Sequence, residues 1–333
     1  MHNPPMQRDT TQTKDTATCW VMTDGRAGNL SSARGLAEVL GDPFAVKTIR
    51  LHRPWLWLPP SLSPPGVLGV ELEDGSALTP PWPDLIITCG RRAIGPALEI
   101  KRRSGGRTKC VHIQHPRMNP AKFDLVAVPA HDRLTGANIE VTTGSVHGVT
   151  RARLDTEAEI WRDRLAHLPA PRVAVLIGGS NSAYRLDAET GRKIGTMLRD
   201  MAKSTGAGLM VTGSRRTDPD AFTAIREALT DVPCEIWSGG GDNPYFGYLG
   251  LADRVIVTGD SVNMVSEAAA TEKPVSVIRL PVVGRADKFE RFHRAMEDAG
   301  AARPFDGTLA DWEHRPLTDT ARVAERVRTL LSD

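Results

Sequence analysis

The stretch VIVTGDSVNMVSEA, residues 255–268, runs from an apolar β-strand through a small polar turn into an amphipathic helix. A helix N-terminus presents free backbone N–H groups and a favourable dipole to an anion, and Asp260, Ser261 and Asn263 add short polar side chains there. Glu267 follows about one turn into the helix, within reach of a sugar hydroxyl. The stretch therefore predicts a nucleotide or nucleotide-sugar site.

Two further stretches repeat this plan, RVAVLIGGSN at 172–181 and LMVTGSRR at 209–216. Each is a short apolar run that ends in glycine and a hydroxyl residue. Three such strand ends indicate a parallel sheet with ligand-binding turns at its carboxyl edge. The alternative is that the glycines only permit tight turns. The additional candidate binding residues are Gly178, Gly179, Ser180, Asn181, Gly213, Ser214 and Arg215.

The composition is that of an ordinary globular protein. A chain of 333 residues is expected to hold two domains of about 150 residues each. Hydrophobic residues make up 40% of the chain and charged residues 25%, as in other globular proteins. The formal net charge of +2 gives no electrostatic reason to expect a nucleic-acid partner.

The four cysteines are Cys19, Cys89, Cys110 and Cys234. They are widely spaced and show no metal-ligand spacing, so no metal is expected. The first three lie in or beside apolar runs, where a free thiol behaves as a small buried hydrophobe, which favours a reducing cytoplasm. No apolar window reaches the length of a transmembrane helix. We expect a cytoplasmic protein, and peripheral contact with the inner membrane is compatible with this location.

Strand and helix patterns predict an α/β protein with two doubly wound, Rossmann-like domains facing a cleft, because strands and helices alternate regularly in the second half. The expected parts are a disordered tail (1–16), an N-terminal Rossmann-like acceptor domain (17–150), a linker helix (151–171), a C-terminal Rossmann-like nucleotide-sugar domain (172–317) and a C-terminal helix packing back on the N-terminal domain (318–333).

Five motifs carry a resemblance to known proteins: WVMTDGRAGN (20–29), PDLIITCGR (83–91), IQHP (113–116), IGGSN (177–181) and TGDSVNMVSEA (258–268). With its two domains, the chain resembles the GT-B glycosyltransferase architecture. In finer detail it resembles the family named for mitochondrial fission in plants, which also has bacterial members. The match covers residues 17–285. That family implies the fold more securely than an activity.

The second half is also similar, more distantly, to the GlcNAc transferases of peptidoglycan lipid synthesis and to lipid-A-disaccharide synthases. This similarity implies that two turns hold the diphosphate and ribose of a UDP-sugar. The corresponding residues are Gly178, Gly179, Ser180, Ser261, Asn263 and Glu267. The chain departs from the pattern at Asn29, near the place of a histidine in those enzymes. Asn29 cannot accept a proton, so Asp24 or His115 supplies the base, or the protein is not a transferase.

Each candidate also has a structural interpretation. Glu267 would complement the dipole of its own helix, and Asp24 would form a turn through its side chain. His115 would be a loop residue, and Arg215 would cap a helix on the surface. Trp55 and Trp57, among leucines and prolines, either cover the core or form an interfacial belt that docks a lipid acceptor.

The expected function is transfer of a sugar from a nucleotide-sugar donor, a UDP-sugar, to an acceptor that the sequence does not identify. A lipid-linked compound is one candidate for this acceptor. The donor is a substrate, and no cofactor is expected. Two alternatives remain open. A sugar-nucleotide epimerase of the same fold would need converging acids and histidines. A non-catalytic scaffold or recruitment protein would keep the fold and lose the base, as the asparagine at position 29 suggests.

Overall fold

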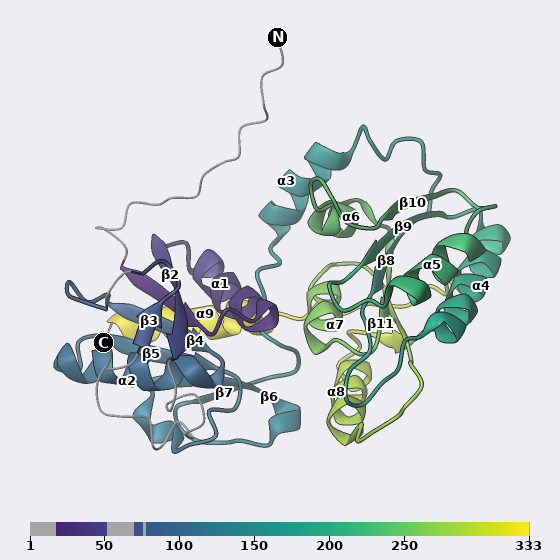
Figure 1. The fold of residues 1–333 in the computed structure, drawn as a ribbon. Coiled ribbons are helices and arrows are strands. Elements are labelled where there is room, and N and C mark those ends of the chain that lie inside the picture. The colour runs from purple at the N-terminus through teal and green to yellow at the C-terminus, as the bar shows by residue number, and fades with distance from the viewer. Residues whose placement is uncertain (1–17, 52–69, 76–77, 333) are drawn as a thin grey trace, which may run out of the picture. The chain divides into compact units, whose positions relative to one another are not determined.

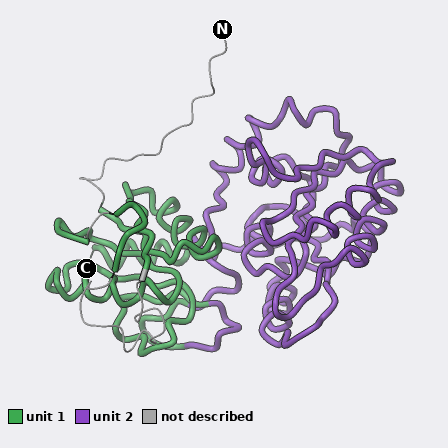
Figure 2. Tube along the Cα trace, in the orientation of Figure 1, with its two compact units in different colours: residues 1–128, 135–140, 321–333 green, residues 129–134, 141–320 purple. Residues whose placement is uncertain are grey.

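The computed structural model describes residues 18–51, 70–75 and 78–332 (Figure 1). Their contacts divide the chain into two compact units (Figure 2). The first unit contains residues 1–128, 135–140 and 321–333. The second contains residues 129–134 and 141–320.

The first unit is built on a seven-stranded sheet in the order β3-β2-β1-β4-β5-β6-β7. Its strands are β1 (Cys19–Thr23), β2 (Phe44–Leu51), β3 (Val70–Leu72), β4 (Leu85–Cys89), β5 (Lys109–Ile113), β6 (Leu125–Pro129) and β7 (Ile139–Thr142). In the described residues, its helices before the C-terminal helix are α1 (Ala27–Leu40) and α2 (Ile94–Arg103). The 3-10 turns η3 (Arg91–Ala93) and η4 (Pro120–Lys122) belong to the same unit, whereas η5 (Ala130–Asp132) clusters with the second unit.

In this sheet the strands from β2 across β1, β4 and β5 to β6 run parallel, and β1, β4 and β6 are buried along their whole length. β1 pairs with β2 on one side and β4 on the other, and β3 adds an antiparallel strand at the edge. Cys19, Cys89 and Cys110 lie buried on β1, β4 and β5 as free thiols. The buried strands expected of a Rossmann-like unit are therefore present, and the short β3 and β7 form the two edges of the sheet.

The second unit contains a six-stranded sheet in the order β10-β9-β8-β11-β12-β13. Its strands are β8 (Arg172–Ile177), β9 (Gly208–Gly213), β10 (Cys234–Trp237), β11 (Arg254–Thr258), β12 (Val275–Ile278) and β13 (Arg303–Pro304), and every pair is parallel. Its helices are α3 (Arg151–Trp161), α4 (Ala188–Thr205), α5 (Pro219–Ala228), α6 (Tyr245–Leu251), α7 (Val262–Ala269) and α8 (Asp287–Asp298).

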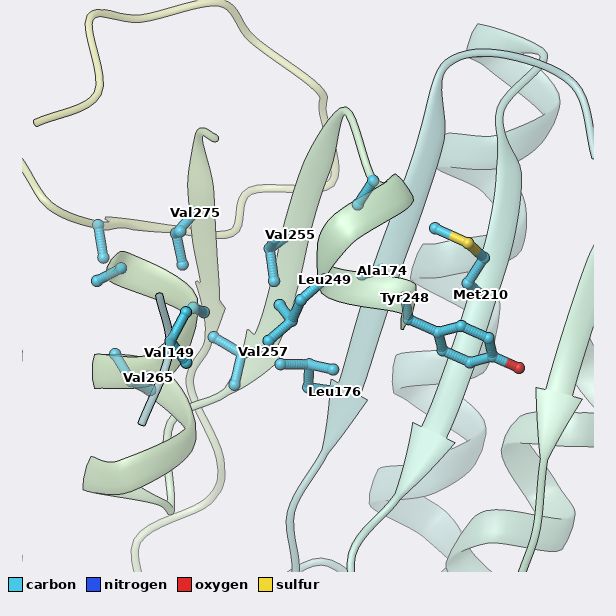
Figure 3. Packing of buried hydrophobic residues seen from close by; sticks show 14 of the residues in the cluster. Val149, Ala174, Leu176, Met210, Tyr248, Leu249, Val255, Val257, Val265 and Val275 are labelled. Atoms are coloured by element: carbon cyan, nitrogen blue, oxygen red, sulfur yellow. The ribbon is translucent and has the colours of Figure 1, made fainter. Parts of the chain in front are cut away.

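Alternate residues of the buried strands point to opposite faces of this sheet, so each face has its own core. On one face, Ala174 and Leu176 of β8 pack with residues of α6 and α7 such as Tyr248 and Val265 (Figure 3). On the other face, Val173 and Val175 of β8 pack with residues of α4 and α5. Because both faces are covered, the polar turns at the strand ends are where this sheet reaches solvent.

The segment predicted as a linker belongs to the second unit's core. α3 packs on α6, where the rings of Trp161 and Tyr248 meet edge to face at 6.3 Å between centroids. Arg164 stacks over the Trp161 ring at 4.2 Å. Burying this large indole fixes 151–161 on the second sheet, so the chain leaves the first unit before this helix.

The C-terminal helix α9 (Asp319–Ser332) belongs to the first unit from residue 321 onwards. Arg328 donates to the carbonyl of Val39 at 3.0 Å, and Arg326 pairs with Glu140 at 3.3 Å. Val323 and Val327 are fully buried on its inner face. The helix thereby packs on the unit that contains β1 to β6.

Candidate functional site

Each sheet has one point at which its strand order reverses. In the first sheet the reversal lies between β1 and β4, and in the second it lies between β8 and β11. Open α/β sheets bind ligands outside the carboxyl ends of the strands at such a switch point. We call these two places the first and second switch points.

At the second switch point, the turns after β8 and β11 are bonded to each other. The N–H of Gly178 donates to Thr258 Oγ1 at 2.7 Å. The N–H of Gly179 donates to Asp260 Oδ2 at 2.9 Å, and the Thr258 hydroxyl donates to Oδ1 at 2.7 Å. The structure therefore brings three predicted site residues together, Gly178, Gly179 and Asp260, with Thr258 as an added partner.

The two glycines of this turn are required by close packing. A Cβ atom on Gly178 would lie 2.1 Å from Asp260 Oδ1. A Cβ atom on Gly179 would lie 2.0 Å from the carbonyl oxygen of Arg216. Both distances are far shorter than a van der Waals contact. The space that a side chain would fill at each glycine is therefore taken by another part of the protein.

Arg216, and not the predicted Arg215, contacts this group. Its guanidinium donates to Asp260 Oδ2 at 2.9 Å, while Arg215 is exposed. Ser214 shapes the turn, because its Oγ accepts from the N–H of Arg216 at 3.2 Å. Gly213 ends β9 just before it. Sequence reasoning missed Arg216, and the adjacent pair of arginines was the only signal for it.

Ser180 and Asn181 hold the loop that leads from β8 to α4. Asn181 Oδ1 accepts from the N–H groups of Ala183 and Tyr184 at 2.7 and 3.0 Å. Its Nδ2 donates to the carbonyl of Asp260 at 3.1 Å. Ser180 Oγ accepts from the N–H of Leu186 at 2.9 Å. Both predicted site residues thus have partners within the protein.

The turn after β11 leads into α7, whose first residues include Asn263. Ser261 is the N-cap of this helix, and its Oγ accepts from the N–H of Met264 at 3.4 Å. His293 supports the turn from α8, with Nε2 at 2.8 Å from the carbonyl of Gly259. A carbonyl only accepts, so Nε2 carries the proton. Burial lowers the pKa of His293 to about 4, which keeps the ring neutral.

Glu267 lies on α7 with 8% of its surface exposed. Tyr245, at the start of α6, donates its hydroxyl to Glu267 Oε2 at 2.6 Å. Burial and the neighbouring carboxylate both raise the pKa of Tyr245 well above its usual value, so the phenol stays protonated and donates. Ser266, the preceding residue, accepts from the N–H of Ser145 at 2.9 Å. Sequence reasoning did not foresee Tyr245, which lies 22 positions away from Glu267.

The first switch point holds Asp24 in a chain of amides. Asn29 Nδ2 donates to Asp24 Oδ1 at 2.8 Å, and Gln114 Nε2 donates to Asn29 Oδ1 at 3.2 Å. The Cys89 thiol also points to Asn29 Oδ1, at 3.6 Å. Gly90, with φ of 93°, makes room for them, since a Cβ atom there would lie 2.5 Å from Asn29 Nδ2.

His115 lies one residue beyond this chain, after Gln114, whose φ of 83° is unusual for a residue other than glycine. Its Nδ1 accepts from the N–H of Arg117 at 3.0 Å. Because Nδ1 is the acceptor, the neutral ring carries its proton on Nε2 and presents a donor. In this geometry His115 is suited to donate a hydrogen bond and poorly suited to remove a proton.

Three other expectations concern sites away from the switch points. Trp55 and Trp57 lie outside the described residues, and their lipid contact stays a prediction. Within residues 18–51, 70–75 and 78–332, no helix has the length and apolar character needed to cross a membrane. In the same residues, no group of three or more His, Cys, Asp or Glu side chains is arranged to hold a metal ion.

The chain matches one protein family over nearly its whole length. The family described as "Mitochondrial fission ELM1" matches residues 27–331. The chain belongs to this family. The resemblance inferred from the sequence motifs is thereby confirmed.

Two further proteins are similar to this chain. The Mitochondrial fission protein ELM1 of Arabidopsis thaliana is 32% identical over 281 residues, which are 75% of this chain and 64% of the plant protein. The chain therefore spans less than two thirds of that relative. An uncharacterised protein of Rickettsia prowazekii is 25% identical over 94% of this chain and 98% of its own length.

Among solved structures, the chain is similar to the UDP-GlcNAc 2-epimerase from Methanocaldococcus jannaschii. The TM-score is 0.52 at 10% sequence identity, over 94% of this chain and 99% of that one. At this identity the likeness concerns the fold alone. Together with the two doubly wound sheets, it confirms the predicted α/β, GT-B-like fold class.

Proposed function

We propose that the chain is a GT-B-type glycosyltransferase that binds a nucleotide-sugar donor, a UDP-sugar, in its second unit. The observation that carries the proposal is the position of Glu267. It is a buried carboxylate on the helix that leaves the second switch point, beside a hydroxyl donor. A nucleotide offers two ribose hydroxyls, which are the kind of donor that Tyr245 already provides.

The second switch point also carries groups suited to a diphosphate. The N-terminus of α7, with Ser261 and Asn263, favours negative charge. Arg215 and Arg216 follow β9 and have exposed side chains. In this proposal Arg215, and Arg216 beside its pair with Asp260, would donate to phosphoryl oxygens. The donor is a substrate in this proposal, and no further cofactor is required.

The proposed chemistry is a direct displacement at the anomeric carbon of the donor. The acceptor hydroxyl loses its proton as its oxygen bonds to that carbon, and the bond to the diphosphate breaks. Asp24 is the proposed base, because Asn29 orients its carboxylate. His115 fits a supporting role, donating from Nε2 to an oxygen of the acceptor. The diphosphate leaves with its charge stabilised by α7 and the arginines.

A non-catalytic scaffold is the second candidate, and Asp260 favours it. Its carboxylate accepts from Gly179 and Arg216, groups that would otherwise bind a phosphate. The plant relative is described as a mitochondrial fission protein. A chain that kept the fold while filling this edge would act through its surface. The two proposals differ in whether the second unit binds a nucleotide.

The epimerase alternative is less well supported by the geometry. It would use His131 as one of its converging groups. His131 is 6% exposed and packs edge to face on Phe292, at 5.8 Å between ring centroids. Burial lowers its pKa to about 4. These features are those of a core residue.

Calorimetric titration with UDP tests the nucleotide proposal. Glu267→Ala removes the carboxylate that would accept from the ribose, so affinity should fall at least about tenfold. Glu227→Ala, an exposed glutamate on α5 of the same unit, is the matched control and should bind as the wild type does. Equal UDP affinity in a folded Glu267→Ala variant, or no UDP binding by the wild type, would favour the scaffold.

A ligand that lacks the ribose hydroxyls separates binding from folding. A dideoxy uridine diphosphate should bind the wild type and Glu267→Ala equally, because this ligand has no ribose hydroxyl to donate to the carboxylate. If the variant loses affinity for both ligands alike, Glu267 acts on the structure of the site and not on the ribose. Release of UDP from UDP-sugars, measured with and without Asp24→Asn, then tests whether the bound donor reacts.

A further inference from the structure

The carboxylate of Asp260 lies on a set of donors that would suit a phosphoryl group. A backbone N–H (Gly179), a hydroxyl (Thr258) and a guanidinium (Arg216) donate to its two oxygens at 2.9, 2.7 and 2.9 Å. Backbone N–H groups and arginine are the usual ligands of phosphate oxygens. The fold has therefore assembled an oxyanion site at the second switch point and filled it with its own side chain.

The fit of this side chain is close on every side that the structure describes. The Asp260 side chain has 0% of its surface exposed, whereas that of Arg216 is 45% exposed. Gly178 leaves no room for a Cβ atom beside Oδ1. Asn181 fixes the backbone carbonyl of Asp260. Among the donors to this carboxylate, Arg216 is thus the one with a large exposed surface, and the one that an incoming anion would meet first.

We propose that Asp260 is a specificity-determining residue, an internal anion that lowers the affinity of this edge for phosphoryl ligands. A diphosphate would have to compete with the carboxylate for Arg216 while lying close to a like charge. Only ligands with further contacts, such as those to Glu267, would then bind well. What this inference says of the natural ligand rests on the proposed nucleotide site. The competition between Asp260 and a phosphoryl group for Arg216 does not depend on it.

Inorganic pyrophosphate is the probe, because it carries the phosphoryl chemistry without a nucleoside. Its affinity is measured by calorimetry for the wild type, Asp260→Asn and Asp260→Ala. Both variants should bind pyrophosphate at least about tenfold more tightly than the wild type. Asp298→Asn, an exposed aspartate at the end of α8, makes the same change in net charge and should leave the affinity unchanged.

The gain must depend on the donors that Asp260 gives up. Adding Arg216→Ala to Asp260→Ala should remove most of it. If the folded Asp260 variants bind pyrophosphate no better than the wild type or Asp298→Asn, the proposal is wrong. If they fold poorly, they are refolded with phosphate or with chloride at equal ionic strength. Phosphate stabilises folded proteins in general, so the gain in yield is compared with that of Asp298→Asn. A larger gain in the Asp260 variants supports the oxyanion site, and an equal gain overturns it.

Titration with UDP separates this inference from the proposed function. A gain in affinity for both pyrophosphate and UDP in Asp260→Asn supports both. A gain in affinity for pyrophosphate alone supports the proposed role of Asp260 and contradicts the nucleotide site.

Discussion

The two switch points have the same topology, and each holds an aspartate with a buried side chain in a different set of partners. At the first, Asp24 accepts from the amide of Asn29, which itself accepts from Gln114, and the mostly exposed side chain of Arg26 pairs with the other oxygen of Asp24 at 3.5 Å. At the second, a charged pair of Asp260 and Arg216 is closed over by the turn after β8. Strand order therefore selects where polar groups gather, and the side chains select what they hold.

The comparison suggests a division of tasks between the units. Asp24 is held by the Asn29 amide at 2.8 Å and by the longer, 3.5 Å pair with the exposed Arg26, so its charge is less tightly compensated than that of Asp260. A carboxylate locked to an arginine keeps anions away until something displaces it. Substitutions at each switch point test this difference, beginning with the largest expected effect.

Adding a methyl group should harm the second switch point more than the first. Gly179→Ala would force a Cβ atom against the backbone of Arg216, so we expect the free energy of unfolding to fall by at least about 3 kcal/mol. Gly90→Ala meets the Asn29 amide, a side chain able to turn away, and adds strain from its positive φ, so about 1–2 kcal/mol is expected.

Chemical denaturation measures both changes. Gly241→Ala is the control for the φ cost, because Gly241 has φ of 64° and nothing within 4 Å of an added Cβ. Equal losses for Gly179→Ala and Gly90→Ala would contradict the difference in rigidity.

Acid should weaken the second switch point through His293. Unfolded histidine binds a proton below about pH 6.5, whereas burial holds the pKa of His293 at about 4. The unfolded chain therefore binds more protons between these values, and stability is lost as pH falls from about 6.5 to 4, by about 2–3 kcal/mol. His293→Gln, which still donates to Gly259, should lose about 2–3 kcal/mol less than the wild type over this range. The remaining acid sensitivity comes from other buried histidines with lowered pKa values, among them His131 and His147.

Thermal melting at steps from pH 7 to pH 4 checks this dependence. His167→Gln, at an exposed histidine of the same unit, should melt as the wild type does at each pH. His112 on β5 is also buried, with a pKa lowered to about 3, so it adds acid sensitivity in the first unit that His293→Gln leaves unchanged. An unaltered acid profile in His293→Gln would show that the supporting hydrogen bond is not the source.

Removing the amide chain should loosen the first switch point by a smaller amount. Asn29→Ala leaves Asp24 and Gln114 without the bonds that join them, which should cost about 1–2 kcal/mol. A double-mutant cycle with Gln114→Ala should show coupling of at least about 0.5 kcal/mol. Additive losses would mean that the two amides act independently, and pyrophosphate affinity should not change in either variant.

The smallest expected effect concerns Trp55 and Trp57, the predicted lipid contact of the N-terminal half. Replacing both by alanine should reduce co-sedimentation with vesicles of anionic phospholipid a few-fold, because Trp favours the membrane interface. Thermal melting is the control. A loss of stability with unchanged sedimentation would support the core interpretation instead.

Much of the fold follows from local sequence pattern. Buried strands such as VIVT at 255–258 are recognisable by their β-branched composition, and α4 by its apolar face between Asp187 and Gly206, its caps. The carboxyl ends of parallel strands meet at one edge, so the closeness of Gly178 and Asp260 was predictable in outline. β3 and β13, of three and two residues, are too short to carry a pattern.

The partners inside each site were not predictable in the same way. Asn29 and Gln114 lie 85 positions apart, and Tyr245 reaches Glu267 from a different helix. Such pairs depend on how a turn directs its side chains, which a periodic pattern does not encode. Arg216 and Arg215 are an example, because the backbone conformation of the turn decides which of two adjacent arginines reaches Asp260.

The rates at which the four cysteines react with a thiol reagent would report local opening of each sheet. Cys19, Cys89 and Cys110 are buried in the first sheet, while Cys234 at the edge of the second is partly exposed. A thiol reagent would modify Cys234 first and the other three only as the first sheet opens. Cys89 contacts Asn29, so a ligand that holds the first switch point closed should lengthen the labelling half-life of Cys89 in the wild-type chain, with no introduced cysteine.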